Sequence, residues 1–251
     1  MRVLPTRPAL PTRTQKRLNK ETAAIEASPD PKESAERKYA SARKAKWFRA
    51  VIGKLGEMAG SGEPCMYCDA NESTDVEHYR PKSVFPKLAL VWENLLWACT
   101  NCNRFKGDRF PPDTEPGERI LNPAEDNVWV HFFIDQFGTL TPVWRPHLNA
   151  FDARAVSTRE ILRLDRQTLQ ERRLQRLRGL KKSVEDTVAR YRSNQITLDE
   201  VKQRIDQWKT EPFQADVADY FLSGPGQKEQ PFAAVLCLVP KTRRKKPGRD
   251  T

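Results

Sequence analysis

Two short cysteine pairs constrain the fold of this chain more than any other feature of its sequence. The first pair stands in "CMYC" at residues 65–68 and the second in "CTNC" at residues 99–102, and the remaining cysteine is Cys237. A spacing of two residues is typical of zinc knuckles, in which two thiolates from each turn bind one tetrahedral Zn²⁺. We therefore predict a structural zinc site whose ligands are Cys65, Cys68, Cys99 and Cys102.

The cysteine pairs are also compatible with two functions that involve no shared zinc ion. A CxxC pair can serve as a redox motif, and the two pairs can be unrelated, although no thioredoxin-like pattern of strand and helix surrounds either of them. A redox or metal-storage protein is therefore one alternative. The arrangement is not typical of the disulfide framework of a small secreted domain, so it favours a reducing cytoplasm.

The sequence shows no signal for export or membrane insertion. The stretch "MRVLPTRPALPTRTQKRLNK" lacks the apolar core that a secretory signal carries. No apolar run approaches the roughly 20 residues that a membrane-spanning helix needs. We expect a cytoplasmic protein that makes no contact with a membrane.

The charge of the chain favours a polyanionic partner. It has 44 Lys and Arg residues against 33 Asp and Glu residues, which gives a formal net charge of +11. Lys and Arg bind nucleic acid by contacting phosphates and releasing counterions. Solvated basic surfaces are common in proteins that bind no nucleic acid, so the charge needs support from a motif.

Changes in composition divide the chain into five segments, which are residues 1–32, 33–60, 61–148, 149–240 and 241–251. The first is rich in Pro, Thr and basic residues without periodicity, which predicts a basic flexible arm. The second predicts one amphipathic helix that ends at Gly60, because apolar residues recur every three or four positions at Trp47, Val51, Leu55 and Met58. The last is a run of basic residues that predicts a flexible basic tail.

The remaining two segments differ in their pattern. Residues 61–148 hold the cysteine pairs and then a predicted hairpin around "DQFGT" at residues 135–139. Residues 149–240 predict a helical region in which Thr197 and Glu200 form a capping box. Its apolar faces include Leu174, Leu177, Val184, Val188 and Tyr191 on one helix and Leu198, Val201, Ile205 and Trp208 on the next. We expect Cys237 to be inert packing in a short buried helix or strand, "PFAAVLCLVP".

Polar residues suited to phosphodiester hydrolysis lie between and beside the cysteine pairs. Glu77 and His78 stand between the pairs, Asn94 precedes the second pair, and Asn103 follows its last cysteine. Hydrolysis of a phosphodiester needs a base that deprotonates water and a divalent cation that neutralises developing charge. Oxygen ligands suit a hard cation such as Mg²⁺ or Mn²⁺, whereas thiolates suit zinc. A lone histidine is nevertheless more often structural than catalytic.

In these residues the sequence resembles the HNH (ββα-metal) endonucleases whose motif is stabilised by a four-cysteine zinc knuckle. The motifs "CMYC", "VEHYRP", "ENLLWACTNC" and "NRFKG" follow one another in the family's order over about residues 62–112. The resemblance implies an α+β, mainly helical fold, with a small ββα-metal HNH module between an N-terminal helix and a C-terminal helical region. It also implies that His78 is the general base, that Glu77 and Asn103 bind the catalytic cation, and that Asn94 orients the imidazole.

The motif differs from the common family pattern at two positions. Asn103 stands where a histidine is more frequent, and Glu77 stands where an aspartate is more frequent. An amide oxygen can still bind a hard metal, and the longer glutamate shifts the geometry slightly. Basic residues near the motif are candidates for phosphate contact, as well as for ordinary surface charge, namely Arg80, Lys82, Arg104, Lys106 and Arg109.

A second resemblance covers most of residues 77–180. The stretches "EHYRPKS", "ILNPAEDN" and "STREILRLDRQTLQERR" look like the HNH subunit of Septu-type and retron-linked antiphage systems. In those systems the nuclease works with an ABC-type or AAA-like ATPase, so the resemblance implies such a partner. Together the motifs predict a metal-dependent endonuclease, with DNA favoured over RNA. The alternative is a non-catalytic zinc-knuckle module that binds nucleic acid or a partner, and a peptide-binding scaffold on the C-terminal helices can coexist with either.

Overall fold

The computed structural model describes residues 1–70, 72–73, 75–111, 120–211, 213 and 215–239. Its α-helices are α1 (Thr12–Glu26), α2 (Pro31–Lys44), α3 (Arg49–Ala59), α4 (Thr100–Lys106), α5 (Ala153–Ile161), α6 (Gln167–Arg192), α7 (Leu198–Thr210), α8 (Ala215–Leu222) and α9 (Phe232–Leu238). Its strands are β1 (Asp75–His78), β2 (Leu95–Ala98), β3 (Phe132–Ile134), β4 (Leu140–Pro142), β5 (Trp144–Arg145) and β6 (Ala150–Phe151). Short 3-10 helices include η1 (Lys46–Phe48), η3 (Trp92–Asn94), η5 (Pro146–Leu148) and η6 (Pro225–Lys228).

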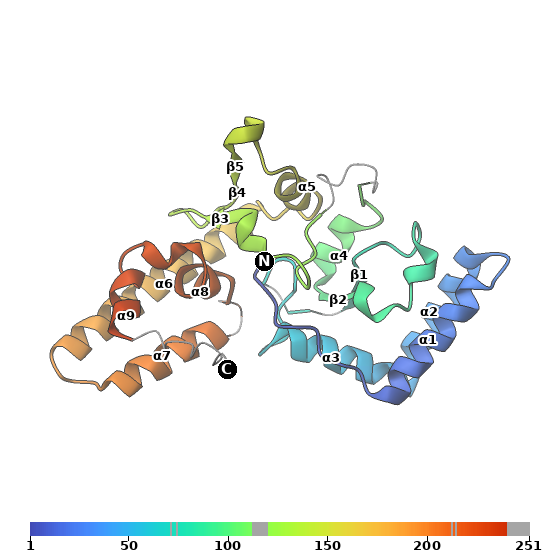
Figure 1. Cartoon of the computed structure of the whole chain (residues 1–251), viewed down its shortest axis with the longest axis horizontal. Helices are drawn as coiled ribbons and strands as arrows, with labels where there is room; N and C mark the ends of the chain where they lie inside the picture. Colours follow the sequence, from blue (N-terminus) through green and yellow to red (C-terminus); the bar gives the residue numbers. More distant parts are fainter. Residues whose placement is uncertain (71, 74, 112–119, 212, 214, 240–251) are drawn as a thin grey trace, which may run out of the picture.

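The helices gather in two groups on either side of the N-terminus (Figure 1). One group contains α1 to α4 with β1 and β2, and the other contains α6 to α9. The segments β3 to β6 and α5 lie along the upper side of Figure 1, between the two groups. The predicted α+β, mainly helical class is confirmed. Among the described residues, none of the helices combines the length and the hydropathy needed to cross a bilayer.

The N-terminal segment is folded, so the prediction of a flexible arm over residues 1–32 is wrong. Helix α1 occupies much of it and buries Thr14, Leu18 and Ile25 on one face, which packs against α2. Before the helix, the guanidinium of Arg7 donates hydrogen bonds to the carbonyl oxygens of Trp92, Glu93 and Leu95. The prolines of this segment obscured the helical spacing, and the arginine binds backbone that lies far away in sequence.

The single helix predicted over residues 33–60 is also wrong. Helix α2 ends at Lys44, Ala45 adopts an extended conformation, and η1 turns the chain into α3. This turn places Phe48 in the core, beside the buried face of α3. Three of the apolar residues from the predicted periodicity, Val51, Leu55 and Met58, are buried on that face, while Trp47 is half-buried before the helix begins.

A small ββα unit follows α3. Strands β1 and β2 pair antiparallel, with Glu77 opposite Leu96 and His78 opposite Leu95, and α4 begins two residues after β2. Four residues in each strand are too few for an independently stable sheet. The unit is therefore held by what packs around it, which includes α3 against β2 and α4 against β1.

The predicted hairpin around "DQFGT" is present as β3 and β4. The Asp135 carboxylate accepts hydrogen bonds from the backbone N–H groups of Phe137 and Thr139, which closes the turn. Gly138 has a positive φ of 77°, and a Cβ there would lie 2.6 Å from the backbone nitrogen of Leu174 in α6. A second hairpin, β5 and β6, follows and exposes the paired rings of Trp144 and Phe151.

The C-terminal part of the described chain is helical, as expected. Helix α6 buries Leu177, Val184 and Val188, and the capping box of Thr197 and Glu200 at the start of α7 is confirmed. The run "PFAAVLCLVP" contains α9, but Cys237 on it is exposed, so the prediction that this thiol is buried packing is wrong. The helix is short and amphipathic, and Phe232 and Val235 face the core instead. The predicted tail, residues 241–251, lies outside the described residues.

A buried network of charges joins the cysteine-containing loop to the helical region. The Asp216 carboxylate on α8 binds Arg173 at 3.1 Å and Arg176 at 3.0 Å, both on α6. The Asp216 backbone N–H donates to the Asp69 carboxylate at 2.7 Å. Arg2 also binds the Asp69 carboxylate, at 3.3 Å. Each carboxylate is nearly fully buried, so its charge depends on these partners.

Asp216→Ala is expected to destabilise the fold strongly. It leaves the fully buried guanidinium of Arg173 without its carboxylate, and an uncompensated buried charge costs about 3–5 kcal/mol. Urea unfolding followed by circular dichroism measures the change. Asp199→Ala removes an exposed ion pair with Lys202 and is the matched control, for which we expect a free energy of unfolding close to that of the wild type. Equal free energies of unfolding for the two variants would contradict a structural role for the network.

Candidate functional site

The two cysteine pairs converge at one point of the structure. All four Sγ atoms lie within 4.8 Å of one another, and all four residues are buried. Cys65 and Cys68 stand in the loop after α3, Cys99 is the N-cap of α4, and Cys102 lies in its first turn. Two hydrogen bonds hold the loop to β2, because the Met66 N–H donates to the Trp97 carbonyl and the Trp97 N–H donates to the Met66 sulfur.

The four thiols fit a tetrahedral zinc ion. Zn–S bonds of about 2.3 Å place the sulfur atoms of a tetrahedron about 3.8 Å apart, and the Sγ atoms of Cys68 and Cys99 are 3.9 Å apart. Hydrogen bonds from the Cys102 and Cys65 thiols lower the pKa of Cys68 to about 6, and those from neighbouring thiols lower the pKa of Cys99 too. Burial raises the pKa of Cys65, and the pKa of Cys102 is raised as well, so without a metal ion the four thiols share their protons unequally. Thiolates are the form that binds zinc, so the cluster suits the metal.

The carboxylate of Glu77 lies between β1 and α4, where it binds a buried lysine. The Lys106 ammonium donates to Glu77 Oε1 at 2.6 Å and to the His78 carbonyl oxygen at 2.7 Å. Lys106 is 0% exposed, so it offers no charge to a nucleic acid, and the phosphate contact predicted for it is wrong. Burial raises the pKa of Glu77, while the positive charge of Lys106 opposes that rise. The ammonium therefore stabilises the charged form of the buried carboxylate.

The imidazole of His78 points to the other side of the strand. Successive side chains of a strand face opposite sides, and the His78 ring packs edge-on against Tyr39 of α2, with centroids 4.6 Å apart. Its Nε2 lies 2.9 Å from the carbonyl oxygen of Ala89. A carbonyl can only accept, so Nε2 carries the proton and Nδ1 keeps its lone pair. Burial lowers the pKa of His78 to about 4, which keeps the ring neutral.

The side chain of Asn94 closes the loop that follows His78. Its Oδ1 accepts a hydrogen bond from the Arg80 N–H at 2.8 Å. Its Nδ2 donates to the carbonyl oxygens of Arg80 and Leu88. The Asn94 carbonyl also accepts from the Tyr79 N–H. One buried asparagine thus fixes both ends of the segment that carries the Ala89 carbonyl and the residues after His78.

The remaining candidates lie around this core. Asn103 is half-buried on α4, one turn before Lys106, and therefore on the face of the helix that approaches β1. Lys82 is half-buried, with its Nζ 5.9 Å from the centroid of the Tyr39 ring. Arg80 is also half-buried and lies over the ring of Phe85. Arg104 and Arg109 are exposed.

Two residues near His78 were missed by the sequence analysis. Tyr39 packs on the imidazole and donates from its hydroxyl to the Val76 carbonyl at 3.2 Å. Arg43, one turn later on α2, binds Asp75 at the start of β1 with a distance of 2.6 Å. The burial of Tyr39 with Ala35 and Ala42 on one face of α2 was readable as helical spacing. The position of Tyr39 and Arg43 beside His78 could not be read from the sequence, because it depends on how α2 packs against β1.

Comparisons with known proteins match the part of the chain that holds the cysteine cluster, Glu77 and His78. Residues 65–109 match the family model described as HNH endonuclease. A Septu protein PtuB from Bacillus thuringiensis is 36% identical over 90 residues, covering 34% of this chain and 33% of the relative. A Septu protein PtuB from Bacillus mycoides (strain KBAB4) is 31% identical over 106 residues, covering 30% and 36%. The chain thus matches about a third of the length of these relatives. The predicted resemblances to HNH endonucleases and to the Septu subunit are confirmed.

Cys99→Ser is expected to release the zinc and to destabilise the ββα unit, because thiolate coordination supplies folding energy to such a small module. Metal analysis of the purified protein and its thermal melting temperature measure both effects. Cys237→Ser is the matched control, since this thiol is exposed and outside the cluster. If Cys99→Ser kept both the zinc content and the melting temperature of the wild type, the four-thiolate site would be refuted.

Proposed function

We propose, from the HNH domain at residues 65–109, that this chain is a metal-dependent endonuclease that hydrolyses phosphodiester bonds. The observation that carries the proposal is the hydrogen bond from His78 Nε2 to the Ala89 carbonyl oxygen. It selects the tautomer in which Nδ1 is free of a proton. A neutral imidazole with a fixed acceptor nitrogen is what a general base requires.

In the proposed reaction, His78 Nδ1 accepts a proton from a water molecule as the water oxygen attacks phosphorus and one P–O ester bond breaks. Tyr39 and the Ala89 carbonyl hold the ring in place from two sides. Asn94 acts through the backbone, because its amide fixes the loop on which Ala89 lies. Pre-organisation of this kind reduces the entropy that must be lost when the reacting atoms meet.

On the resemblance to HNH endonucleases, Glu77 and Asn103, which lie on the facing elements β1 and α4, would hold the catalytic cation, in competition with the Lys106 ammonium that the Glu77 carboxylate binds. When bound, Mg²⁺ or Mn²⁺ supplies charge that neutralises the developing negative charge on the phosphate and the leaving oxygen. Lys106 holds the Glu77 carboxylate at this position by its hydrogen bond to Oε1. The same ammonium binds the carbonyl of His78, so it links the carboxylate to the backbone of the proposed base.

Basic residues around the unit are candidates for contact with the nucleic acid backbone, and they are Lys82, Arg80, Arg104, Arg109 and the newly identified Arg43. Lys82 and Arg43 lie near enough to His78 for their positive charges to lower its pKa further, beyond the effect of burial. Phosphate groups that approach His78 therefore meet positive charge on that side. We favour DNA over RNA as the substrate.

We further propose that the chain acts in antiphage defence with an ATPase partner, in the cytoplasm. The relatives it matches are named Septu protein PtuB, and the similarity includes only about a third of their length. Support for this part comes from the similarity and from the charge of +11 rather than from a contact within the chain. The retron link has no support beyond the sequence resemblance.

One observation favours a second candidate, a non-catalytic zinc-knuckle module. Glu77 is 5% exposed and already has a cation, Lys106, at 2.6 Å, while His78 is 7% exposed. A docking module has no need for a base or a catalytic cation, so a buried Glu–Lys pair serves it equally well. The two candidates differ in one measurable property, which is cleavage that depends on His78.

His78→Ala is expected to leave nucleic acid binding near normal and to lower the cleavage rate by about 10²–10⁴-fold, the usual range for the loss of a general base. The assay incubates plasmid, single-stranded DNA and tRNA with the purified protein in Mg²⁺ or Mn²⁺, with and without the presumed ATPase. His147→Ala is the matched control, because His147 is exposed on η5, outside the site.

The outcomes separate the two candidates. Cleavage by the wild type and by His147→Ala, together with loss in His78→Ala, supports the endonuclease. Cleavage by His78→Ala at the wild-type rate refutes this residue as the base. Binding of nucleic acid without cleavage in all conditions, with and without the ATPase, supports the docking module.

A further inference from the structure

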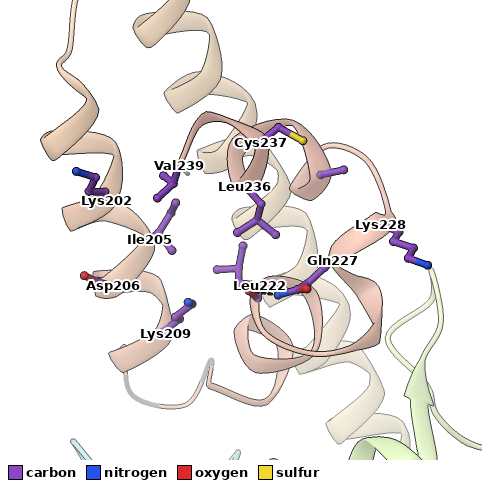
Figure 2. Close-up of a pocket in the computed structure, with 11 residues that line it drawn as sticks. Lys202, Ile205, Asp206, Lys209, Leu222, Gln227, Lys228, Leu236, Cys237 and Val239 are labelled. Carbon is purple, nitrogen blue, oxygen red and sulfur yellow. Dashed lines mark hydrogen bonds between the residues drawn. The ribbon is translucent and has the colours of Figure 1, made fainter. Parts of the chain in front are cut away.

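A groove in the C-terminal helices lies outside everything described above. It has a volume of about 830 Å³ and lies between α7 on one side and α8, η6 and α9 on the other. Figure 2 shows the side chains of Ile205, Leu222, Leu236 and Val239 side by side at its centre. A space of this size is typical of a binding site for a ligand or for a few side chains of a partner.

The floor of the groove is aliphatic. Ile205 and Leu222 are buried, while Leu236 and Val239 are half-buried and line the walls together with Ala233. Among the residues that the structure describes, no aromatic side chain lines it. When another apolar surface covers apolar side chains that are partly exposed in a folded protein, the free energy of the system falls.

The rim of the groove is positive. Figure 2 shows Lys202, Asp206 and Lys209 along α7 on one side and Lys228 on the other. Three lysines and one aspartate therefore line the rim. The Lys202 ammonium also lies 2.8 Å from a carboxylate oxygen of Asp199, outside the groove lining. The sequence after Val239, which lies outside the described residues, contains six basic residues, namely Lys241, Arg243, Arg244, Lys245, Lys246 and Arg249. This basic sequence carries the same charge as the lysines of the rim, so it is a poor candidate for the segment that occupies the groove.

We propose that this groove binds an acidic amphipathic segment of a partner protein, whose apolar side chains cover Ile205, Leu222 and Leu236 while its carboxylates face Lys209 and Lys228. An amphipathic helix presents apolar residues at positions i, i+3, i+4 and i+7, which suits a groove bounded by helices. Complementary charge at the rim selects acidic over basic segments. This inference needs no nuclease activity and rests on the groove alone.

Nucleic acid is the other polyanion that a basic rim can attract, but the floor of the groove argues against it. Sites for single strands combine basic residues with aromatic side chains on which bases stack. Here the lining is aliphatic, which matches leucine or isoleucine side chains. The experiment therefore compares the two occupants directly.

Cys237 provides a built-in reporter for the test. It lines the groove and is exposed, whereas the four other cysteines are buried in the cysteine cluster. The measured quantity is the rate at which a maleimide reagent modifies Cys237 in the full-length, zinc-loaded chain. The variant Cys237→Ser gives the background from the cluster, which is subtracted.

The probe is a synthetic helical peptide with leucine at positions i, i+3, i+4 and i+7 and glutamate on the flanking positions. We expect it to slow modification of Cys237 by about tenfold at saturation, since a covering ligand excludes the reagent in proportion to occupancy. A peptide with lysine in place of glutamate, and one with serine in place of leucine, are expected to change the rate by less than about twofold.

The double variant Lys209→Glu/Lys228→Glu tests the rim. We expect this variant to bind the glutamate peptide about tenfold or more weakly than the wild type does, because like charges across an interface are unfavourable. We expect it to bind the lysine peptide more tightly than the wild type does. Lys16→Glu/Lys20→Glu is the matched control, with the same change of charge on the exposed face of α1. Circular dichroism confirms that both variants keep the helical content of the wild type.

Three results would overturn the proposal. The first is protection of Cys237 by a single-stranded oligonucleotide but not by the glutamate peptide. The second is the same affinity for the glutamate peptide in the Lys209→Glu/Lys228→Glu and Lys16→Glu/Lys20→Glu variants. The third is an unchanged modification rate with every peptide.

Discussion

The ββα unit depends on four thiols that meet between two turns of chain. Strands of four residues bury too little apolar surface to be stable alone, and the described part of residues 69–98, between the cysteine pairs, has little regular structure of its own. Sulfur atoms within 4.8 Å of one another provide the missing constraint once a metal ion binds them. The position of α4 follows from this, since Cys99 and Cys102 begin that helix.

The same loop is fixed from outside by buried charges. Asp69 follows Cys68 directly and adopts a left-handed conformation with φ at 54°, which turns its side chain toward α8 and its carbonyl toward α6. Its carboxylate accepts from the Asp216 N–H, and Asp216 in turn binds Arg173 and Arg176. The cysteine cluster and the C-terminal helices are therefore parts of one packed structure, and a change in either is expected to affect the other.

The strand β1 divides the candidate chemistry between two environments. Glu77 faces α4, where a buried ammonium neutralises it, and His78 faces α2, where Tyr39 and a backbone carbonyl orient it. Alternation of side chains along a strand makes this separation unavoidable for neighbouring residues. Lys106 bridges the two environments, because it binds the side chain of one residue and the backbone of the other.

The sequence alone determined what local spacing can encode. The cysteine pairs, the Glu-His step, the hairpin at Asp135 and the capping box at Thr197 are each read within a few residues, and the order of the motifs indicated the HNH family. Only the tertiary structure decided that Arg7 binds the backbone near β2, that Tyr39 packs on His78, that Lys106 is buried, and that Cys237 is exposed. These facts depend on which helix faces lie against one another, and contacts between residues far apart in sequence leave no periodic signal along the chain.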